Sequence, residues 1–393
     1  MSRAEATVQP DENALRLNAA RVLQLIKHLS ARSIIKLTII AVALIIALVP
    51  MPAALVERFY SNGLYPKLQS LLAPVANSIP FAFIDLFIIA LALGLPAWWA
   101  RRLMKAGRGR RLKTLGRLAF NTAVAASIAF LIFQLLWGLN YARKPLAAKL
   151  DFDEERLTPE AIRGLKRLAV ERLNAEYAEG RAAWPNEKDW REQLHWSFDQ
   201  VTSELGNARS IKAEAPKSSV LNFYLAATGI EGFMNPFGYE VILDSEALPF
   251  ERPFLLAHEW AHLAGFADEA EASFVGLLAC LRSDSAAIRY SGWLALYQFT
   301  PWPVTASTED MQQALRFDPP PRPLPEVIAD LKAIRERVSR HRNNFLSRAQ
   351  WFVYDGFLKA NRVRAGIGSY GRVVRLIAGT RFESGWIPAR RAE

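Results

Sequence analysis

The sequence is poor in cysteine and histidine. It has one cysteine, Cys280, and five histidines in 393 residues. A single cysteine excludes an internal disulfide and a cysteine-rich zinc site. Cys280 lies in the apolar segment FVGLLACL, where a small buried side chain is the expected role. A metal site in this chain would therefore need histidine and carboxylate ligands.

Acidic residues are absent from Arg101 to Arg117, although this segment carries eight arginines or lysines. It supplies eight of the eleven net positive charges and leaves three (11 − 8) for the rest of the chain. A basic block between two apolar runs is typical of a cytoplasmic loop rather than of a nucleic-acid surface. We therefore expect a lipid bilayer as a partner and no nucleic acid.

Long apolar runs make up much of the first third of the chain. Each is long enough to cross about 30 Å of hydrocarbon as a helix. Two more runs follow the first, which argues against a cleaved signal peptide. The predicted transmembrane helices are Leu37–Val56, Ile79–Ala100 and Leu118–Ala142. The sequence thus predicts a cytoplasmic tail over 1–36, a membrane domain over 37–142 and an outer domain over 143–393.

The loop charges predict the orientation. The tail up to Lys36 has six basic and three acidic residues, whereas the loop Glu57–Ser78 has two basic residues and one acidic residue. Positive charge stays on the cytoplasmic side, so the N-terminus and the Arg101–Arg117 loop are expected there. Three spans then place residues 143–393 outside the cytoplasm.

One carboxylate, Asp85, lies within the second predicted span. An unpaired acid in lipid costs a few kcal/mol, so Asp85 is expected to reach water or to pair with Asn121 or Gln134. We expect a packing role rather than an ion pathway.

The outer domain is expected to be mostly helical, with a small amount of strand. Apolar periodicity predicts helices over Leu157–Gly180 and Asp189–Gly206, and the Tyr239–Asp244 segment is typical of a short strand. Further helices are expected over Ser285–Phe299, over 326–360 and near the C-terminus. The predicted fold class is a mainly α membrane protein whose outer domain is α+β and zincin-like.

The motif HEWAH, His258 to His262, is the strongest chemical signal in the sequence. On a helix over about 253–264, the two histidines share a face and can grip one cation. Glu259 is then placed to accept a proton from water, as in H-E-x-x-H zinc peptidases. Gly265 permits the left-handed turn that ends such a helix.

Three acids compete for the third ligand position. Asp268 has the spacing of the metzincin pattern, but the downstream methionine that this class needs is represented only by Met311, in a polar segment. Glu271 heads the apolar stripe of a helix over 268–281, while Glu269 lies on a face of small residues. An acid on a core face needs a partner or a cation. We therefore expect His258, His262 and Glu271 to bind Zn²⁺, with Asp268 and Glu269 as alternatives.

An oxyanion-stabilising donor is also needed for peptide hydrolysis. The sequence offers four candidates and does not rank them well, although Tyr290 in RYSGW is chosen as the catalytic candidate. The others are His195, Tyr239 and Tyr297. Asn235 in NPFG is expected to form a turn, and the strand at Tyr239–Asp244 is expected to pair with an extended substrate.

The chain also resembles a bacterial membrane family known only as a domain of unknown function, with three spans followed by a gluzincin-like outer domain. The matching segments are WGLNYARKPL, GFMNPFGYEVILD, HEWAHLAGFADEAEASF, RYSGW and YDGFLKAN…SYGRVV. The resemblance implies that Glu271, the acid immediately before the Ala of the segment EASF, is the acid that recurs among members of this family. Many members have asparagine at the position of Ser273. It further implies a bacterial inner-membrane protein with a periplasmic, peptidase-like site.

The expected function is that of a membrane-anchored zinc metallopeptidase, with Glu259 as general base and a peptide or protein as substrate. The alternative is a catalytically silent, peptidase-like protein that binds a peptide or a cell-envelope partner. The intact Glu259 favours catalysis, because a structural metal site does not require it.

Overall fold

The computed structural model describes residues 30–182, 187–207, 209–211, 215–300, 321–361, 363 and 372–391. Met311, weighed above, lies outside these residues. The chain is mostly helical and divides into two compact units. One unit comprises Met1–Val49 and Trp98–Ile132, and the other comprises Pro50–Ala97 and Phe133–Glu393.

Among the residues that the structure describes, three helices are long and apolar enough to cross a membrane, the number predicted from the sequence. They cover Ala31–Leu48, Phe83–Lys105 and Arg108–Leu136. The second contains α5 (Phe83–Ile89), a π-helical turn η2 (Ala90–Gly94) and α6 (Leu95–Lys105). The others are α2 (Ala31–Leu48) and, after η3 (Arg108–Arg110), α7 (Arg111–Leu136). These helices fit a membrane protein.

In the first unit, Lys36 Nζ donates to Asn121 Oδ1 at 2.6 Å. Asn121 therefore has a partner on α2. Asp85 instead lies in the second unit, where it accepts from Ser219 Oγ at 2.5 Å and from the backbone N–H of Val220 at 2.9 Å. Its carboxylate thus fixes the start of a helix of the folded part, which is a packing role.

The segment between the first two spans folds as part of the second unit. It is helical and contains α3 (Ala53–Leu55), the π-helix η1 (Val56–Leu64) and α4 (Tyr65–Asn77). Tyr60 and Tyr65 are buried in its core. The large folded unit therefore begins at Pro50, and not at residue 143 where the sequence placed the outer domain.

The remaining helices agree with most of the predicted positions. The elements after the third span are η4 (Gly138–Ala142), α8 (Leu146–Lys149), η5 (Glu154–Arg156), α9 (Pro159–Ala182), α10 (Glu187–Glu204), α11 (Asn222–Thr228), α12 (Arg252–Leu263), α13 (Glu269–Leu281), α14 (Ala286–Phe299), α16 (Pro325–Arg340), α17 (Asn344–Ala360), α18 (Val373–Gly379) and η7 (Ser384–Trp386). The single helical stretch expected over 326–360 is two helices. Asn343 separates them because its side chain accepts from the N–H groups of Phe345 and Leu346 and caps α17.

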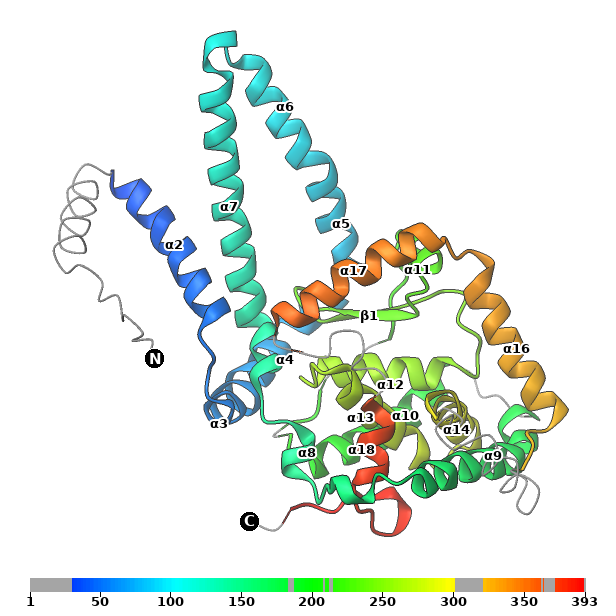
Figure 1. Cartoon of the computed structure of the whole chain (residues 1–393). Helices are drawn as coiled ribbons and strands as arrows, with labels where there is room; N and C mark the ends of the chain where they lie inside the picture. The colour runs from blue at the N-terminus through cyan, green and yellow to red at the C-terminus, as the bar shows by residue number, and fades with distance from the viewer. Residues whose placement is uncertain are drawn as a thin grey trace, which may run out of the picture. The chain divides into compact units, whose positions relative to one another are not determined.

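A two-stranded antiparallel sheet lies beside the motif helix α12 (Figure 1). It is formed by β1 (Gly232–Asn235) and β2 (Glu240–Leu243), with Gly232 opposite Leu243. Lys217 forms a parallel bridge to Ile242 on the other side of β2. Among the described residues β1 pairs with β2 alone, so the unpaired strand edge belongs to β1, and not to β2 as predicted.

Helix α13 is the centre of the folded unit. All thirteen of its residues are buried, and it contacts α10, α12, α14 and α18. Asp268 is its N-cap and accepts from the N–H groups of Ala270 and Glu271. The helix lies directly beneath α12, so that α12 is held between the small sheet and α13 (Figure 1).

Gly276 is the point of closest approach between α13 and α12. A Cβ at this position would lie 2.9 Å from the backbone nitrogen of His258 and 3.1 Å from the carbonyl carbon of Ala257. These are backbone atoms of a helix, which cannot rotate away as a side chain can. The small-residue face of α13 is therefore its contact face with the motif.

Gly276→Ala is expected to push α13 away from α12 and to destabilise the fold by about 1–3 kcal/mol, as overpacking does. The measurement is thermal unfolding of the detergent-solubilised chain. Gly164→Ala on α9 is the matched control, because a Cβ there meets no atom within 4 Å. That substitution should be neutral or slightly stabilising, since alanine is the better helix former. Equal stability of the two variants would contradict the close contact.

Candidate metal centre

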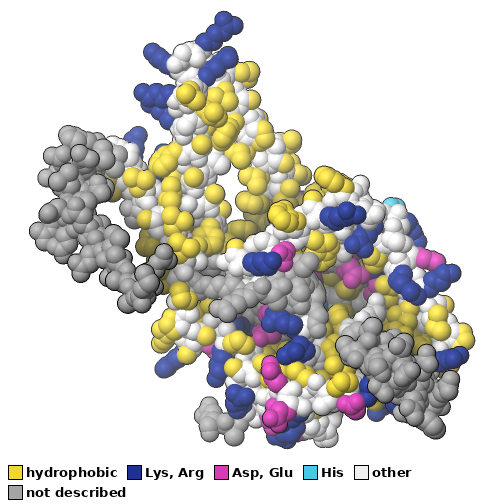
Figure 2. Space-filling view, in the orientation of Figure 1, with side chains coloured by type: hydrophobic (Ala, Val, Ile, Leu, Met, Phe, Trp, Pro, Cys, Tyr) yellow, Lys and Arg dark blue, Asp and Glu magenta, His cyan; other side chains and the backbone are white. Residues whose placement is uncertain are grey.

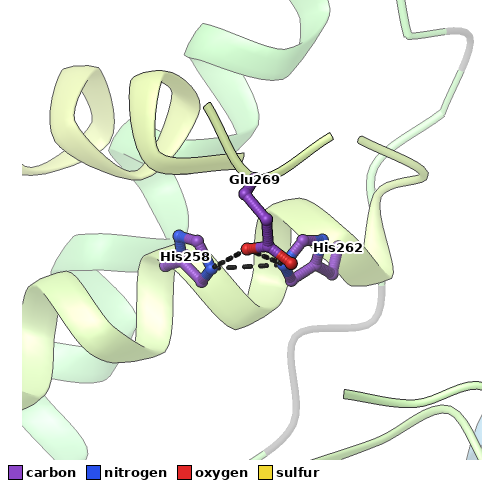
Figure 3. A group of neighbouring side chains, drawn as sticks. All are labelled: His258, His262 and Glu269. Carbon is purple, nitrogen blue, oxygen red and sulfur yellow. Dashed lines mark hydrogen bonds and ion pairs between the residues drawn. The ribbon is translucent and has the colours of Figure 1, made fainter. Parts of the chain in front are cut away.

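The site is formed by the face of α12 that carries both motif histidines and by the first turn of α13. His258 and His262 are one helical turn apart, and their rings meet at a centroid distance of 4.7 Å. Their Nε2 atoms lie 3.2 Å apart. Figure 3 shows both rings turned toward the same carboxylate, that of Glu269.

Glu269 completes a group of three that could hold a metal ion. Its Oε2 lies 3.3 Å from the Nε2 atom of each histidine (Figure 3). The same oxygen is buried and has no hydrogen-bond partner. Its other oxygen, Oε1, accepts from the hydroxyl of Tyr354 on α17. Two nitrogens and one oxygen therefore converge on one point. The other oxygen of Glu269 is held in place by its hydrogen bond from Tyr354.

The predicted third ligand, Glu271, does not lie at this point; the structure places Glu269 beside the two histidines instead. Glu271 Oε1 accepts from the backbone N–H of Leu146 at 2.7 Å. Burial, and then the neighbouring Asp268, raise the pKa of Glu271 to about 7. The carboxyl is thus used to fix α8 against α13. The apolar-stripe criterion failed because α13 is buried on every side, so no stripe marks a single core face.

Asp268, the metzincin-like alternative, caps α13 and pairs with Arg372. Its carboxylate is engaged at the surface of the unit and is not part of the three-residue group. Of the three acids weighed from the sequence, Glu269 alone is placed beside the histidines in the described structure.

Hydrogen bonds to the outer ring nitrogens orient both histidines. His262 Nδ1 donates to the backbone carbonyl of Phe266 at 2.8 Å, which leaves a lone pair on its Nε2. Ser273 Oγ lies 3.2 Å from His258 Nδ1. Such partners fix ring orientation and tautomer in metal sites. The sequence marked Ser273 only as a departure from asparagine, and the Phe266 carbonyl could not be inferred from a side-chain pattern.

The carboxylate of Glu269 and the two histidines shift one another's pKa values, and both shifts favour a positive charge between them. Burial lowers the pKa of His262, but the carboxylate of Glu269 outweighs this effect and raises it to about 9. Burial raises the pKa of Glu269, yet the two histidines hold it well below its usual range.

Glu259 lies on the sheet-facing side of α12. Its Oε1 and Cγ would be 3.0 and 3.2 Å from a Cβ at Gly232, so a side chain at this position of β1 would crowd the Glu259 carboxylate. Its Oε2 is buried and has no hydrogen-bond partner. Burial raises the pKa of Glu259, against the lowering effect of His258 and His262. A carboxylate with a raised pKa and a free oxygen beside the histidines can accept a proton.

The candidate oxyanion donors have structural partners elsewhere. Tyr290 is fully buried and its hydroxyl donates to Asp330 at 2.7 Å. Tyr239 donates to the carbonyl of Leu136, and His195 contacts the carbonyl of Ile211. Lys166 Nζ lies 3.3 Å from the ring centre of Tyr297. Besides Ser273, a second hydroxyl contacts the three-residue group, that of Tyr354. Tyr354 begins the matching segment YDGFLKAN, but no feature of the sequence assigned it to the site.

The C-terminal end of α12 is held by four side chains. The last carbonyls of a helix have no partner within the helix, and here each of four successive carbonyls accepts from a different residue. Gly265, at φ +88, allows the chain to turn so that these carbonyls remain accessible. The pairs are Trp137 Nε1 to His262 (2.8 Å), Tyr65 Oη to Leu263 (2.7 Å), Asn207 Nδ2 to Ala264 (3.0 Å) and Arg143 Nη1 to Gly265 (3.0 Å).

Arg143 also forms a buried two-bond pair with Glu57, which Lys149 joins at 3.0 Å. Burial raises the pKa of Glu57, but Arg143 and then Lys149 outweigh it and lower the value to about 2. Burial lowers the pKa of Lys149 despite this carboxylate. We therefore attribute the stabilisation of the charged Glu57 carboxylate chiefly to its two hydrogen bonds with Arg143.

Acid is expected to weaken the fold through Glu57. A lowered folded-state pKa contributes stability above the unfolded value of 4.5, and this is lost as the pH falls toward 2. The loss is about 3 kcal/mol at most. Thermal unfolding of the detergent-solubilised chain between pH 7 and pH 2 measures it, and Glu57→Gln should flatten this part of the profile. Glu336→Gln, an exposed matched control, should not; identical profiles for the two variants would contradict the assignment.

A comparison with protein families finds a match for most of the chain. No curated protein and no solved structure matches the chain. A family model described as a protein of unknown function, DUF3810, matches residues 60–378 and so includes the second and third spans and the three-residue group. The chain therefore belongs to the DUF3810 family.

Proposed function

We propose that the protein is a membrane-anchored zinc metallopeptidase that acts outside the cytoplasm. One observation carries the proposal: the three converging atoms are separated by 3.2, 3.3 and 3.3 Å. Ligands about 2.0–2.1 Å from a tetrahedral zinc ion are about 3.3 Å from one another. The buried Oε2 of Glu269, which has no hydrogen-bond partner, is likewise suited to a cation. The residues present fit zinc.

His258, His262 and Glu269 would hold the ion and leave a fourth position open, as catalytic sites do. When bound, zinc would polarise a peptide carbonyl and make water more acidic. Glu259 would take a proton from the attacking water, whose oxygen forms a bond to the carbonyl carbon. As the carbon–nitrogen bond breaks, Glu259 would return that proton to the leaving nitrogen.

The free edge of β1 supports an extended peptide as substrate. Gly232 lies at the start of this strand and packs against Glu259. A peptide that adds to β1 by backbone hydrogen bonds would thus run past the proposed base. Tyr354, whose hydroxyl contacts Glu269, would hold that ligand in place.

The location outside the cytoplasm is supported by charge. The basic residues of the Arg101–Arg117 segment lie at the adjoining ends of the second and third spans, where the chain turns back, and positive ends remain cytoplasmic. Residues after the third span then lie on the opposite side. A reporter that is active only in the cytoplasm, fused at Lys149, should be inactive; activity there would reverse the orientation.

Metal analysis of the purified full chain tests the proposal directly. About one zinc per chain is expected in the wild type, and His258→Ala should lose it. Peptide termini in membranes from cells that express either form would then be mapped by mass spectrometry, with termini present only in the wild type as the expected result. Less than about 0.2 zinc per chain, unchanged by His258→Ala, would overturn the metal assignment, since such a site holds one ion.

A further inference from the structure

Helix α17 exposes large apolar side chains on one side. Phe345, Phe352 and Val353 are 79%, 81% and 66% exposed. The opposite side is buried, with Ser347 and Leu358 almost inaccessible. A soluble protein rarely leaves several large apolar residues exposed together on one helix. We therefore expect another apolar surface to cover this face of α17.

The exposed face forms a continuous arc. At 100° per residue, the apolar positions from Phe352 round to Phe357 cover about 140° of the helix surface. Arg348 and Lys359 lie together on one flank of this arc, and both are exposed. An apolar face bordered by basic side chains is the pattern of a helix that lies in a membrane interface.

Helix α11 continues the apolar surface. Val220, just before it, and Phe223 in its first turn are 63% and 71% exposed. α11 packs against α17, and Tyr224 donates to Gln350 at 2.8 Å. Figure 2 shows hydrophobic side chains gathered over these helices, on the side of the unit from which α5 extends. We name Val220, Phe223, Phe345, Phe352 and Val353 the apolar shelf.

The shelf is connected to the start of the second span. Asp85, in the first turn of α5, binds Ser219 and Val220 immediately before α11. The residues of α5 that face outward are themselves apolar, with Phe83, Leu86 and Phe87 exposed as a lipid-facing helix requires. The shelf thus begins where a membrane-spanning helix begins.

The shelf is also connected to the end of the third span. Phe357 of α17 contacts the rings of Phe133, in the last turn of that span, and of Tyr141 just beyond it. α17 therefore extends from the end of one span toward α11 at the start of another. A helix fixed to the ends of two spans lies at the level where both leave the hydrocarbon.

We propose that α11 and α17 form a bilayer-contact surface, with the apolar shelf inserted among the lipid acyl chains and Arg348 and Lys359 at the headgroups. The insertion depth for such a helix is about 5–10 Å. This inference does not depend on zinc binding or on peptidase activity. It adds a fourth attachment to the membrane, parallel to the surface, beside the three spans.

Lipid-borne quenchers test this contact in the full chain. Cys280 is buried and is the single native cysteine, so a cysteine introduced at an exposed site can be labelled selectively with a fluorophore. Phe223→Cys, Phe345→Cys and Phe352→Cys probe the shelf, and Lys332→Cys on the exposed side of α16 is the matched control. Each labelled protein is placed in vesicles of phosphatidylcholine and phosphatidylglycerol.

Labels on the shelf are expected to lose about half or more of their emission to doxyl groups on the acyl chains and to be protected from iodide in the water, because the helix lies within the acyl boundary. The label at Lys332 should be quenched by iodide and should keep its emission in the presence of doxyl lipids. Iodide access at all three shelf positions, equal to that at Lys332, would overturn the proposal. Protection from iodide without quenching by doxyl lipid would also overturn it, because a second copy or another protein would then cover the shelf.

Discussion

Glu269→Gln is expected to lower the zinc affinity of the full chain by more than about 100-fold, whereas Glu271→Gln should leave it within a few-fold of wild type. Loss of a side chain that hydrogen-bonds to a metal ligand already lowers metal affinity by about 10–100-fold. Removal of an anionic ligand itself should lower it more. Glu269 Oε2 faces both histidines at 3.3 Å. Glu271 instead binds the backbone of Leu146.

The two variants control for each other. Both replace a buried glutamate in the first turn of α13 by its amide, so general damage to the helix should affect them alike. Burial raises the pKa of Glu271 to about 7, so the amide resembles a form that the carboxyl already adopts near neutral pH. Competition with a chromophoric chelator at pH 7 measures the affinities. Zinc loss in Glu271→Gln with retention in Glu269→Gln would restore the ligand expected from sequence.

Glu259→Gln should slow peptide cleavage by about 10²–10⁴-fold while zinc remains bound, because a positioned general base contributes that much. The substrate is a peptide that carries a cleavage site mapped in membranes from cells that express the wild type. The Oε2 atom of Glu259 is buried without a hydrogen-bond partner, so the amide removes proton-accepting capacity and breaks no bond seen in the structure. Rate and zinc content are measured on the same preparation.

Glu336→Gln on the exposed side of α16 is the control for that experiment and should retain both rate and zinc. Loss of zinc together with activity in Glu259→Gln would mean that Glu259 supports α12 against Gly232 of β1 rather than acting as a base. Zinc retention without any change in cleavage would favour the non-catalytic alternative, a peptidase-like protein that binds a peptide or an envelope partner.

The spans and most helices could be predicted from the sequence because their signals are local. Apolar runs long enough to cross a bilayer gave the three spans, and periodicity gave α9 and α10. The break between α16 and α17 is also local, since Asn343 caps α17 with its side chain. The polar stretch SRHRNN, residues 339–344, interrupts the apolar pattern at this point and is the signal that was overlooked.

The two histidines were predictable for the same reason, because residues four apart on a helix share a face. The third ligand was not, because its position depends on how α13 crosses α12. The sequence placed Glu269 on a face with Ala272, Ser273 and Gly276, and small residues there were taken to mark the face without a partner. In the structure they allow the two helices to touch at His258. A glycine beside a motif is thus a signal of close helix packing.

Tyr354 and the carbonyl donors depend on contacts between distant parts of the chain. Tyr354 is 85 residues from Glu269, and Tyr65 is 198 residues from Leu263. No pattern in a single sequence connects such positions.

The four donors at the end of α12 have a practical consequence for anyone who shortens this protein. A soluble fragment that begins at residue 143 would lack Tyr65 and Trp137, which serve the carbonyls of Leu263 and His262. The His262 carbonyl would keep its hydrogen bond from the N–H of Gly265, but the Leu263 carbonyl would lose its donor, and a buried carbonyl without a donor costs about 1–3 kcal/mol. The fragment would also lack Glu57, the partner of Arg143. Removing the spans for easier purification would thus loosen the turn that carries the second histidine, and an empty site in such a fragment would say little about the intact protein.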